Sequence, residues 1–394
     1  MSAEPFYYSW CSQALPARLP VDRTDGDEFI LEDGQRIYDF ICTSFQANFG
    51  HDFDPIKNRI IQQLGSMPIA SPKSIFPLKQ NVSRRLTELI GLDAGKIFYT
   101  VSGAEAVENA LKIARQITGR TIVAARKKSY HGASLGALSV TGDWRNEPHL
   151  TFDQGTLRIP DHDEDPDLAL TEQLFQQTGP EKIAAVILET ISGTNGMSIA
   201  PADWFDKMQN LCRKYGCLFI LDEVLVGFGR CGTDFAFQAY SLKPDLVCMS
   251  KAMTGGYIPL GAVWTSQEIA NHYDTETMTC GLTNYAHPLG LAALDGVLDS
   301  LSDPHFRKTM LDNQTCLQKN LKDLSRCPHV TEIRHRGLMA AIYLNQPAPA
   351  WKMGIEQGVH FFSKENLVII APPYISTIDR LESAFAKLAH LLDS

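Results

Sequence analysis

Apolar residues recur along the middle of the chain at two different spacings. Between about residues 85 and 265, short apolar runs of strand length are separated by longer segments with apolar residues at helical spacing. One such segment, residues 104–119, ends in a glycine, as helices commonly do. We expect strands at 96–101, 121–125, 182–188, 217–222, 245–249 and 261–265. Strands that alternate with helices predict a mostly parallel sheet with helices on both of its faces.

The pattern differs on both sides of this region. Near the start of the chain, Asp33-Gly34 stands between alternating apolar residues, which predicts a hairpin. Beyond residue 285 we expect helices at 285–300, 303–324 and 376–392 and strands at 337–344 and 366–371. The chain is therefore predicted to be α/β, with a large domain at 46–289 and a smaller α+β domain formed by 1–45 and 290–394.

Composition narrows the class of protein. Of the 394 residues 44% are hydrophobic, which is ordinary for a globular protein, and the formal net charge of −9 argues against nucleic-acid binding. No apolar run is long enough for a membrane helix, and no secretory signal is visible. The nine cysteines form no CxxC pair, which favours reduced thiols. We predict a cytoplasmic protein without a metal site.

A tight turn follows the first central strand. Ser102-Gly103-Ala104 ends the strand, and a helix begins near Glu105. Free backbone N–H groups at a helix N-terminus, made accessible by the glycine, suit a phosphate. The alternative is an ordinary strand-to-helix turn with a serine cap.

Two charged residues follow buried strands. Asp222 ends the run 217–222, where a carboxylate needs a cationic or N–H partner such as a protonated ring nitrogen; the alternative is capping or pairing with Arg230. Lys251 follows 245–249, where burial would lower its pKa and favour Schiff-base chemistry; the alternative is a lysine lying over the sheet edge. Gly255-Gly256 are interpreted as backbone kept small beside this lysine.

An aromatic residue completes the set of candidates. Tyr130-His131 lies among small residues and could stack on a flat ligand, although such an aromatic is commonly part of a core. In a parallel sheet the carboxyl ends of the strands meet at one crevice. A phosphate site, a stacking ring, a carboxylate and a reactive lysine at that crevice are together what pyridoxal 5'-phosphate requires.

A competing motif is present. The stretch GFGRCG places Gly227, Gly229 and Gly232 in the dinucleotide-binding pattern, which would indicate a nicotinamide-dependent oxidoreductase. That pattern requires the glycines directly after a strand and at the start of a helix. Here the first glycine is five residues past Asp222, and no long helical pattern follows.

The motifs SGAEAVENALKIAR, YHG, LDEVLVGFGR, SKAMTGGYIPLGAV, GLTNYAHPLG and RGLM occur in this order. In these stretches the chain resembles the class III aminotransferases, pyridoxal-phosphate enzymes with the fold of aspartate aminotransferase (fold type I), over nearly its whole length. In detail it looks most like the branch with taurine–pyruvate and other ω-amino transaminases. An aminomutase of the same fold would share this chemistry and stays open as an alternative.

The resemblance implies a role for each matched residue. Lys251 would hold the cofactor as a Schiff base and carry the proton, Asp222 would bind the ring nitrogen, and Glu189 would lie near the substrate. The remaining cofactor contacts would come from residues around the ring and the phosphate, namely Val224, Tyr130, His131, Ser102, Gly103 and Ala104. Thr283 would reach the phosphate in the neighbouring subunit of a homodimer.

Some features depart from the family pattern. Ala104 stands where many members have serine, and Glu189 is followed by Thr190 rather than proline. The C-terminal segment 359–377 lacks the arginine with which many members bind a substrate carboxylate, and its only cationic candidate is Lys364.

Tyr8 and Trp10 could line the mouth of the substrate site or simply anchor the N-terminus. The expected substrates are an amine or amino acid as donor and a keto acid or aldehyde as acceptor.

Overall fold

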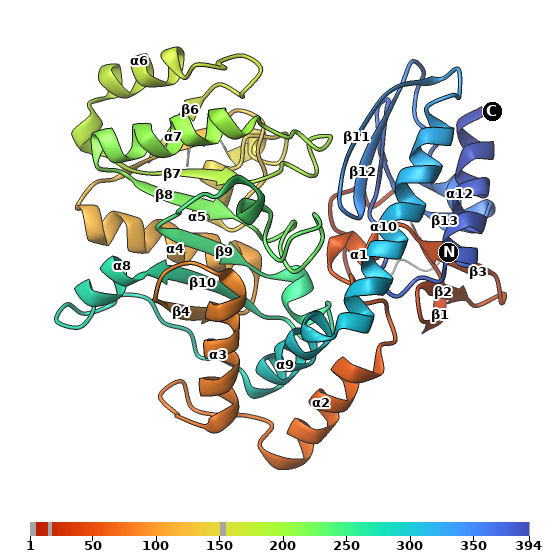
Figure 1. Cartoon of the computed structure of the whole chain (residues 1–394), viewed down its shortest axis with the longest axis horizontal. Helices are drawn as coiled ribbons and strands as arrows, with labels where there is room; N and C mark the ends of the chain where they lie inside the picture. The colour runs from red at the N-terminus through yellow and green to blue at the C-terminus, as the bar shows by residue number, and fades with distance from the viewer. Residues whose placement is uncertain (1–4, 15–17, 150–154, 394) are drawn as a thin grey trace.

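The computed structural model describes residues 5–14, 18–149 and 155–393. Its largest sheet has seven strands in the order β4-β10-β9-β8-β7-β5-β6 (Figure 1). The strands are β4 (Gly95–Thr100), β10 (Gly261–Ser266), β9 (Leu246–Met249), β8 (Leu218–Asp222), β7 (Ile183–Glu189), β5 (Ile122–Arg126) and β6 (Thr156–Ile159). All pairs from β9 to β6 are parallel, and only β10 runs antiparallel to its neighbours. The prediction of a mostly parallel sheet is confirmed.

Helices cover both faces of this sheet because successive strand residues point to opposite sides. On one face α4 (Gly103–Thr118) packs in the same apolar cluster as Ile187 and Ile220. On the other, α7 (Ala202–Tyr215) packs with Val186 and Phe219. The shorter α5 (Leu135–Val140) lies between β5 and β6 in the chain, α6 (Ala169–Thr178) lies between β6 and β7, and α8 (Gln267–His272) follows β10. The inner strands are therefore buried on both faces, as their continuous apolar runs indicate, whereas the edge strands β4 and β6 are only partly buried.

The N-terminal and C-terminal segments form one smaller sheet together. Its order is β1-β2-β3-β13, with β1 (Val21–Asp25), β2 (Glu28–Leu31), β3 (Arg36–Asp39) and β13 (Val359–His360). β2 and β3 form the hairpin predicted from Asp33-Gly34, and β13 pairs with β3 in parallel. This pairing joins the two ends of the chain in the way the prediction of a shared small domain requires. The proposed boundaries at residues 45/46 and 289/290 stay a prediction.

A third sheet and several helices complete this half of the molecule. The sheet has the order β11-β12-β15-β14, with β11 (Val330–Arg336), β12 (Met339–Leu344), β15 (Leu367–Ile370) and β14 (Phe362–Lys364). The long α9 (Pro288–Ser302) and α10 (Pro304–Leu324) precede it, and α12 (Ile378–Asp393) ends the described chain beside α10 (Figure 1). The remaining helices are α2 (Asp54–Ser66), α3 (Pro77–Ile90), α11 (Trp351–Glu356) and the short turn α1 (Cys42–Phe45).

The turn α1 is unusual in its backbone. Cys42, Thr43, Ser44 and Phe45 all have φ between 48° and 68°, the left-handed region that side chains with a Cβ rarely adopt. Thr43 is tied to Asp39 through its backbone N–H and its hydroxyl, and the Cys42 thiol donates to the Ala371 carbonyl. These contacts hold the turn against the sheet, and its last residue, Phe45, faces Lys251, whose Nζ lies 5.8 Å from the ring centroid.

Candidate active site

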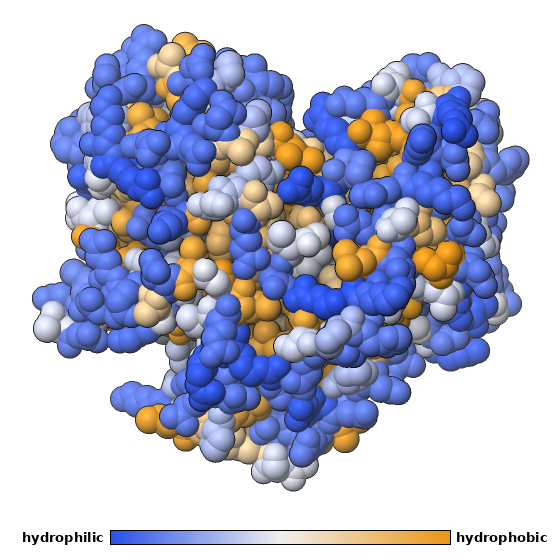
Figure 2. Space-filling view, viewed as in Figure 1, coloured by the Kyte–Doolittle hydropathy of each residue, from blue (hydrophilic) through white to orange (hydrophobic). Residues whose placement is uncertain are grey.

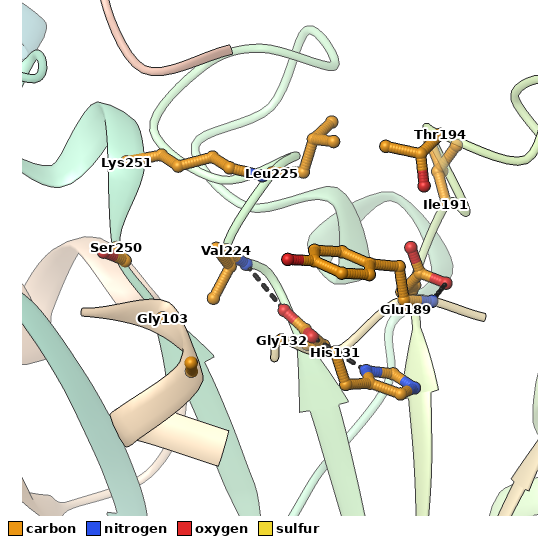
Figure 3. Close-up of a pocket in the computed structure, with 13 residues that line it drawn as sticks. Gly103, His131, Gly132, Glu189, Ile191, Thr194, Val224, Leu225, Ser250 and Lys251 are labelled. Atoms are coloured by element: carbon orange, nitrogen blue, oxygen red, sulfur yellow. Dashed lines mark hydrogen bonds and ion pairs between the residues drawn. The ribbon is translucent and has the colours of Figure 1, made fainter. Parts of the chain in front are cut away.

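One cavity of about 150 Å³ lies at the carboxyl ends of β7, β8 and β9, beside the start of α4 (Figure 3). Eight of the residues predicted for the site line it: Gly103, Ala104, Tyr130, His131, Glu189, Asp222, Val224 and Lys251. Strand register brings them together, because Glu189 is paired with Asp222 and Asp222 with Cys248, three residues before the lysine. The structure therefore places these side chains in one crevice, as expected for the strand ends of a parallel sheet.

Lys251 enters the cavity from a short 3₁₀ turn that follows β9. Its backbone is left-handed, with φ of 47°, and its side chain extends across the cavity toward Leu225 (Figure 3). Burial lowers the pKa of Lys251 below its ordinary value; Arg145 acts in the same direction, while Asp222 and Glu189 act in the opposite one. A lysine with a lowered pKa has a larger neutral, nucleophilic fraction near neutral pH.

Gly255 and Gly256 were interpreted as backbone kept small beside Lys251, and this interpretation is wrong. Both glycines have left-handed backbone, with φ of 64° and 82°. A Cβ at Gly255 would lie 3.0 Å from Ile56, and one at Gly256 would lie 3.0 Å from Gln46, so neither contact involves Lys251. The glycines serve the turn that leads from the lysine to β10, not the space around the lysine.

Asp222 is held by two donors. Its Oδ2 lies 2.8 Å from Nδ1 of His131, and its Oδ1 accepts the backbone N–H of Val224 at 3.0 Å. The alternative partner, Arg230, instead donates to the carbonyls of Leu338 and Pro372. Both His131 and Asp222 are buried, and each carboxylate oxygen has lone pairs beyond the one engaged here. Asp222 is thus a fixed acceptor at the floor of the cavity.

A second buried carboxylate belongs to Glu189. Its Oε2 accepts the hydroxyl of Ser192 at 2.7 Å and the backbone N–H of Tyr130 at 3.3 Å. Burial raises the pKa of Glu189, and the charges of His131 and Arg126 oppose this. Arg126 is itself buried and lies 3.7 Å from the same carboxylate oxygen. Sequence reasoning missed Arg126 and Ser192, although Arg126 ends a buried strand just as Asp222 does.

The N-terminus of α4 forms another wall. Ser102 is the N-cap, and its hydroxyl accepts the N–H of Glu105 at 3.2 Å, which leaves Gly103 and Ala104 as the residues of this turn that line the cavity. A Cβ on Gly103 would lie 2.7 Å from Val224, and one on Gly132 would lie 2.8 Å from Ala104. Because these positions carry no side chain, the backbone packs closely against Val224 and Ala104 at the cavity, where free N–H groups at a helix N-terminus suit an anion.

Replacing Gly103 by alanine is expected to weaken cofactor affinity about tenfold, because the new methyl group displaces Val224 into the space for the ring. Titration of the apoenzyme with pyridoxal 5'-phosphate, followed by absorbance, measures the change. Gly65→Ala in α2 is the control, since nothing lies within 4 Å of a Cβ at that position. Equal affinities of the two variants would contradict a close approach at Gly103.

Four predicted residues lie outside the cavity. Ser102 caps the helix, and Thr283 is exposed on the loop before α9. Tyr8 packs on Phe6 near Arg18, whereas Trp10 contacts Arg145, which in turn stacks on Tyr130. The cavity also contains residues that the sequence did not single out, namely Gly132, Ile191, Thr194, Leu225 and Ser250.

The glycines of GFGRCG do not form a dinucleotide site. Gly227, Gly229 and Gly232 lie in a run of turns between Asp222 and the short 3₁₀ helix Ala236–Tyr240, and no α-helix begins there. This excludes the structural context that the motif requires. Within the described residues, none of the helices has the length and apolarity to span a bilayer.

Comparisons with known proteins agree with this geometry. The pattern of the family "Aminotransferase class-III" matches residues 11–392. An acetylornithine aminotransferase of Halalkalibacterium halodurans is 32% identical over 382 residues, which is 96% of each chain. The taurine:2-oxoglutarate aminotransferase of Bifidobacterium kashiwanohense, solved with pyridoxal phosphate and glutamate, superposes with a TM-score of 0.92 at 29% identity, covering 99% of this chain and 95% of its own. An amine transaminase from an uncultivated Pseudomonas species, also with bound pyridoxal phosphate, gives a TM-score of 0.91 at 27% identity over 99% and 98% of the chains.

The fold and the site define a pyridoxal-phosphate enzyme of fold type I. The chain belongs to the class III aminotransferases, so it is an aminotransferase whose cofactor is pyridoxal 5'-phosphate. The residues present fit this group: a lysine with a lowered pKa, a buried carboxylate with free lone pairs, and a helix N-terminus kept open by glycine.

Proposed function

We propose that this enzyme moves an amino group from an amine or ω-amino acid to a keto acid or aldehyde, with Lys251 as both covalent anchor and proton carrier. The observation that supports this most is the shared cavity of Lys251 and Asp222. Bound pyridoxal phosphate supplies an electron sink that stabilises negative charge on the donor carbon. The other requirements fall to side chains of this chain.

Each residue has one proposed task. Nζ of Lys251, once freed by the incoming amine, would take the proton from the donor carbon and deliver it to the cofactor, for which its lowered pKa is suited. Asp222 would hold a proton on the cofactor's ring nitrogen, and His131 orients Asp222 through the 2.8 Å contact. Val224 and Tyr130 would bound the ring, and the N–H groups of Gly103 and Ala104 would bind phosphate. Glu189 would lie beside the substrate and fix the backbone of Tyr130.

The relatives support a range of donors rather than one substrate. Those described above are named for acetylornithine, taurine and amines, and plant relatives from Oryza sativa are named γ-aminobutyrate transaminases. An amino group on a terminal carbon is common to the three named amino compounds. We therefore propose an ω-amino compound as donor.

The test is direct. The purified holoenzyme should show a visible cofactor band and convert ω-amino donors when a keto acid is present. Spectroscopy and product analysis across γ-aminobutyrate, taurine, acetylornithine and a simple amine, each with pyruvate or 2-oxoglutarate, identify the pair. Product formation from a donor alone would indicate an aminomutase, and no turnover with any pair would contradict transamination.

A homodimer with shared sites is the proposed assembly. Thr283 is exposed and does not line the cavity of its own subunit. This is the position expected of a residue that contributes to the site of a partner subunit. Large apolar side chains on and after α2 are also exposed, and Figure 2 shows apolar residues at the surface of the lower end of the molecule, where α2 lies. They are Ile61, Leu64, Ile69 and Ile75. Reduced thiols, with nine free cysteines, support the proposed cytoplasmic location.

Shared sites predict complementation. Lys251→Ala and Thr283→Glu should each be inactive alone, the second because a carboxylate replaces a phosphate contact. Coexpression should form hybrid dimers in which one of the two sites has both native residues, so the purified hybrid should have about half of wild-type activity. Two differently tagged subunits, purified in tandem and assayed, give the measurement. No recovery in purified hybrids would contradict the assignment of Thr283.

A further inference from the structure

A keto acid acceptor brings a carboxylate into the site, and that charge needs a cationic partner. The C-terminal segment offers Lys364, which lies on β14, is largely exposed and has Glu365 at 3.7 Å. Arg126 is buried beneath Glu189 and is already engaged with that carboxylate. The structure supplies a different cation, from a segment that the sequence motifs do not include.

Arg145 lies directly against the active-site aromatic residue. Its guanidinium carbon is 4.7 Å from the ring centroid of Tyr130, and 4.8 Å from those of both Trp10 and Trp144. Trp10 and Trp144 also pack edge to face at 6.0 Å. Aromatic faces attract a guanidinium and hold it in place without using its N–H donors.

The hydrogen bonds of Arg145 are incomplete. Nη1 donates to Oδ2 of Asp143 at 2.5 Å, and Oδ1 of Asp143 accepts the backbone N–H of Arg145 at 2.9 Å. The Nε atom is buried and has no hydrogen-bond partner in the part of the chain that the structure describes. A guanidinium carries five N–H donors, so the pair with Asp143 leaves donors for a second oxyanion. A buried donor without a partner is costly, and a ligand oxygen would remove that cost.

The residues that contact Arg145 line two neighbouring spaces. Tyr130 lines the active-site cavity, whereas Asp143 and Trp144 line a neighbouring cleft of about 850 Å³ between the large sheet and β14–β15. Thr194 lines both, so the cleft and the cavity lie on either side of this residue. The charge of Arg145 also contributes to the lowered pKa of Lys251, which places it within electrostatic reach of the reacting centre.

We propose that Arg145 binds the carboxylate of the keto acid acceptor and so determines the preference for acidic over neutral acceptors. This inference rests on the proposed transamination and assigns the substrate's anionic end to the junction of cavity and cleft. Asp143 fixes the guanidinium, and the three aromatic rings keep it from turning away. Trp10, expected near the substrate mouth, acts here by packing on Arg145.

The experiment compares two acceptors with one amino donor, pyruvate and the neutral aldehyde propanal. In Arg145→Gln, the ratio of kcat/KM for pyruvate over propanal should fall about 10- to 100-fold, as expected for loss of a charge-assisted hydrogen bond. The ratio does not depend on the fraction of folded enzyme. The inhibition constant of propanoate, a carboxylate without the keto group of pyruvate, should rise by a similar factor. Arg145→Lys should recover part of both effects.

Two further variants distinguish the explanations. Arg84→Gln, an exposed arginine on α3, controls for net charge and should leave the ratio unchanged. Lys364→Gln tests the rival cation. An unchanged ratio in Arg145→Gln, or a larger fall in Lys364→Gln, would overturn the inference while the wild-type activity upholds the proposed function. Wild-type enzyme that uses neither acceptor with any donor would overturn both.

Discussion

Substitution of Lys251 by alanine is expected to abolish the covalent link to the cofactor and to lower transamination about a thousandfold or more, because one residue supplies both the anchor and the proton carrier. Lys251 reaches the cavity with a lowered pKa, and among the described lining residues it is the one with an amine. The visible band that borohydride abolishes in the wild type should be missing in the variant. Steady-state assays with the best donor and acceptor measure the rate.

The control is a lysine that is close to Lys251 in the sequence but does not line the cavity. Lys243, exposed on the loop before β9, can be changed to alanine without touching the cavity. Its variant should keep the band and the activity. A borohydride-sensitive band that persists unchanged in Lys251→Ala would show that another residue carries the cofactor.

The second large effect is expected for Asp222→Asn, which should lower kcat/KM about 10²- to 10³-fold. The asparagine keeps the shape of the side chain but removes the charge that holds a proton on the ring nitrogen, and loss of one partner of a buried charge pair is costly. The same change weakens the contact to Nδ1 of His131, now at 2.8 Å. Asp222→Glu retains the charge and should recover part of the activity.

The readout separates a catalytic role from a structural one. Asp222→Asn should still bind the cofactor through Lys251 and show a band whose pH dependence is altered, since the ring nitrogen no longer keeps its proton. Thermal unfolding of both variants reports folding. If Asp222→Asn lost only thermal stability, with kcat/KM per folded molecule intact, the residue would be structural.

Much of the site could be predicted because it follows from strand ends. Asp222 and Lys251 come directly after continuous apolar runs, so their place at the crevice followed from a parallel sheet. Gly103 was recognisable from the turn that opens α4. The partner of Asp222 was not predictable, since nothing in the local sequence distinguishes His131 from Arg230 as the nearby group. That choice depends on how the segment after β5 folds back over the sheet.

Other features could not be predicted from the pattern of apolar and polar residues. β11 is an exposed edge strand with the sequence VTEIRHR, so burial does not impose the alternation that reveals a strand. β6 has four residues, and β13 has two, which is too short for any periodicity. The contact between Trp10 and Arg145 joins residues far apart in the sequence; Trp10 was a candidate for the substrate mouth, but no motif indicated Arg145. The hydroxyl of Ser102 caps the helix, as the alternative interpretation expected, and its contact to a phosphate stays a prediction.

The pairing of Glu189 with Asp222 and of Asp222 with Cys248 has a consequence for the folding of the enzyme. Side chains alternate between the two faces of a strand, so a slip of β8 by one residue would turn the Asp222 carboxylate away from the lysine. Parallel strands also pair only after long stretches of chain have closed between them, which makes this assembly slow. Correct register of β8 between β7 and β9 is therefore a condition for activity, because it brings Asp222 to the cavity that Lys251 enters.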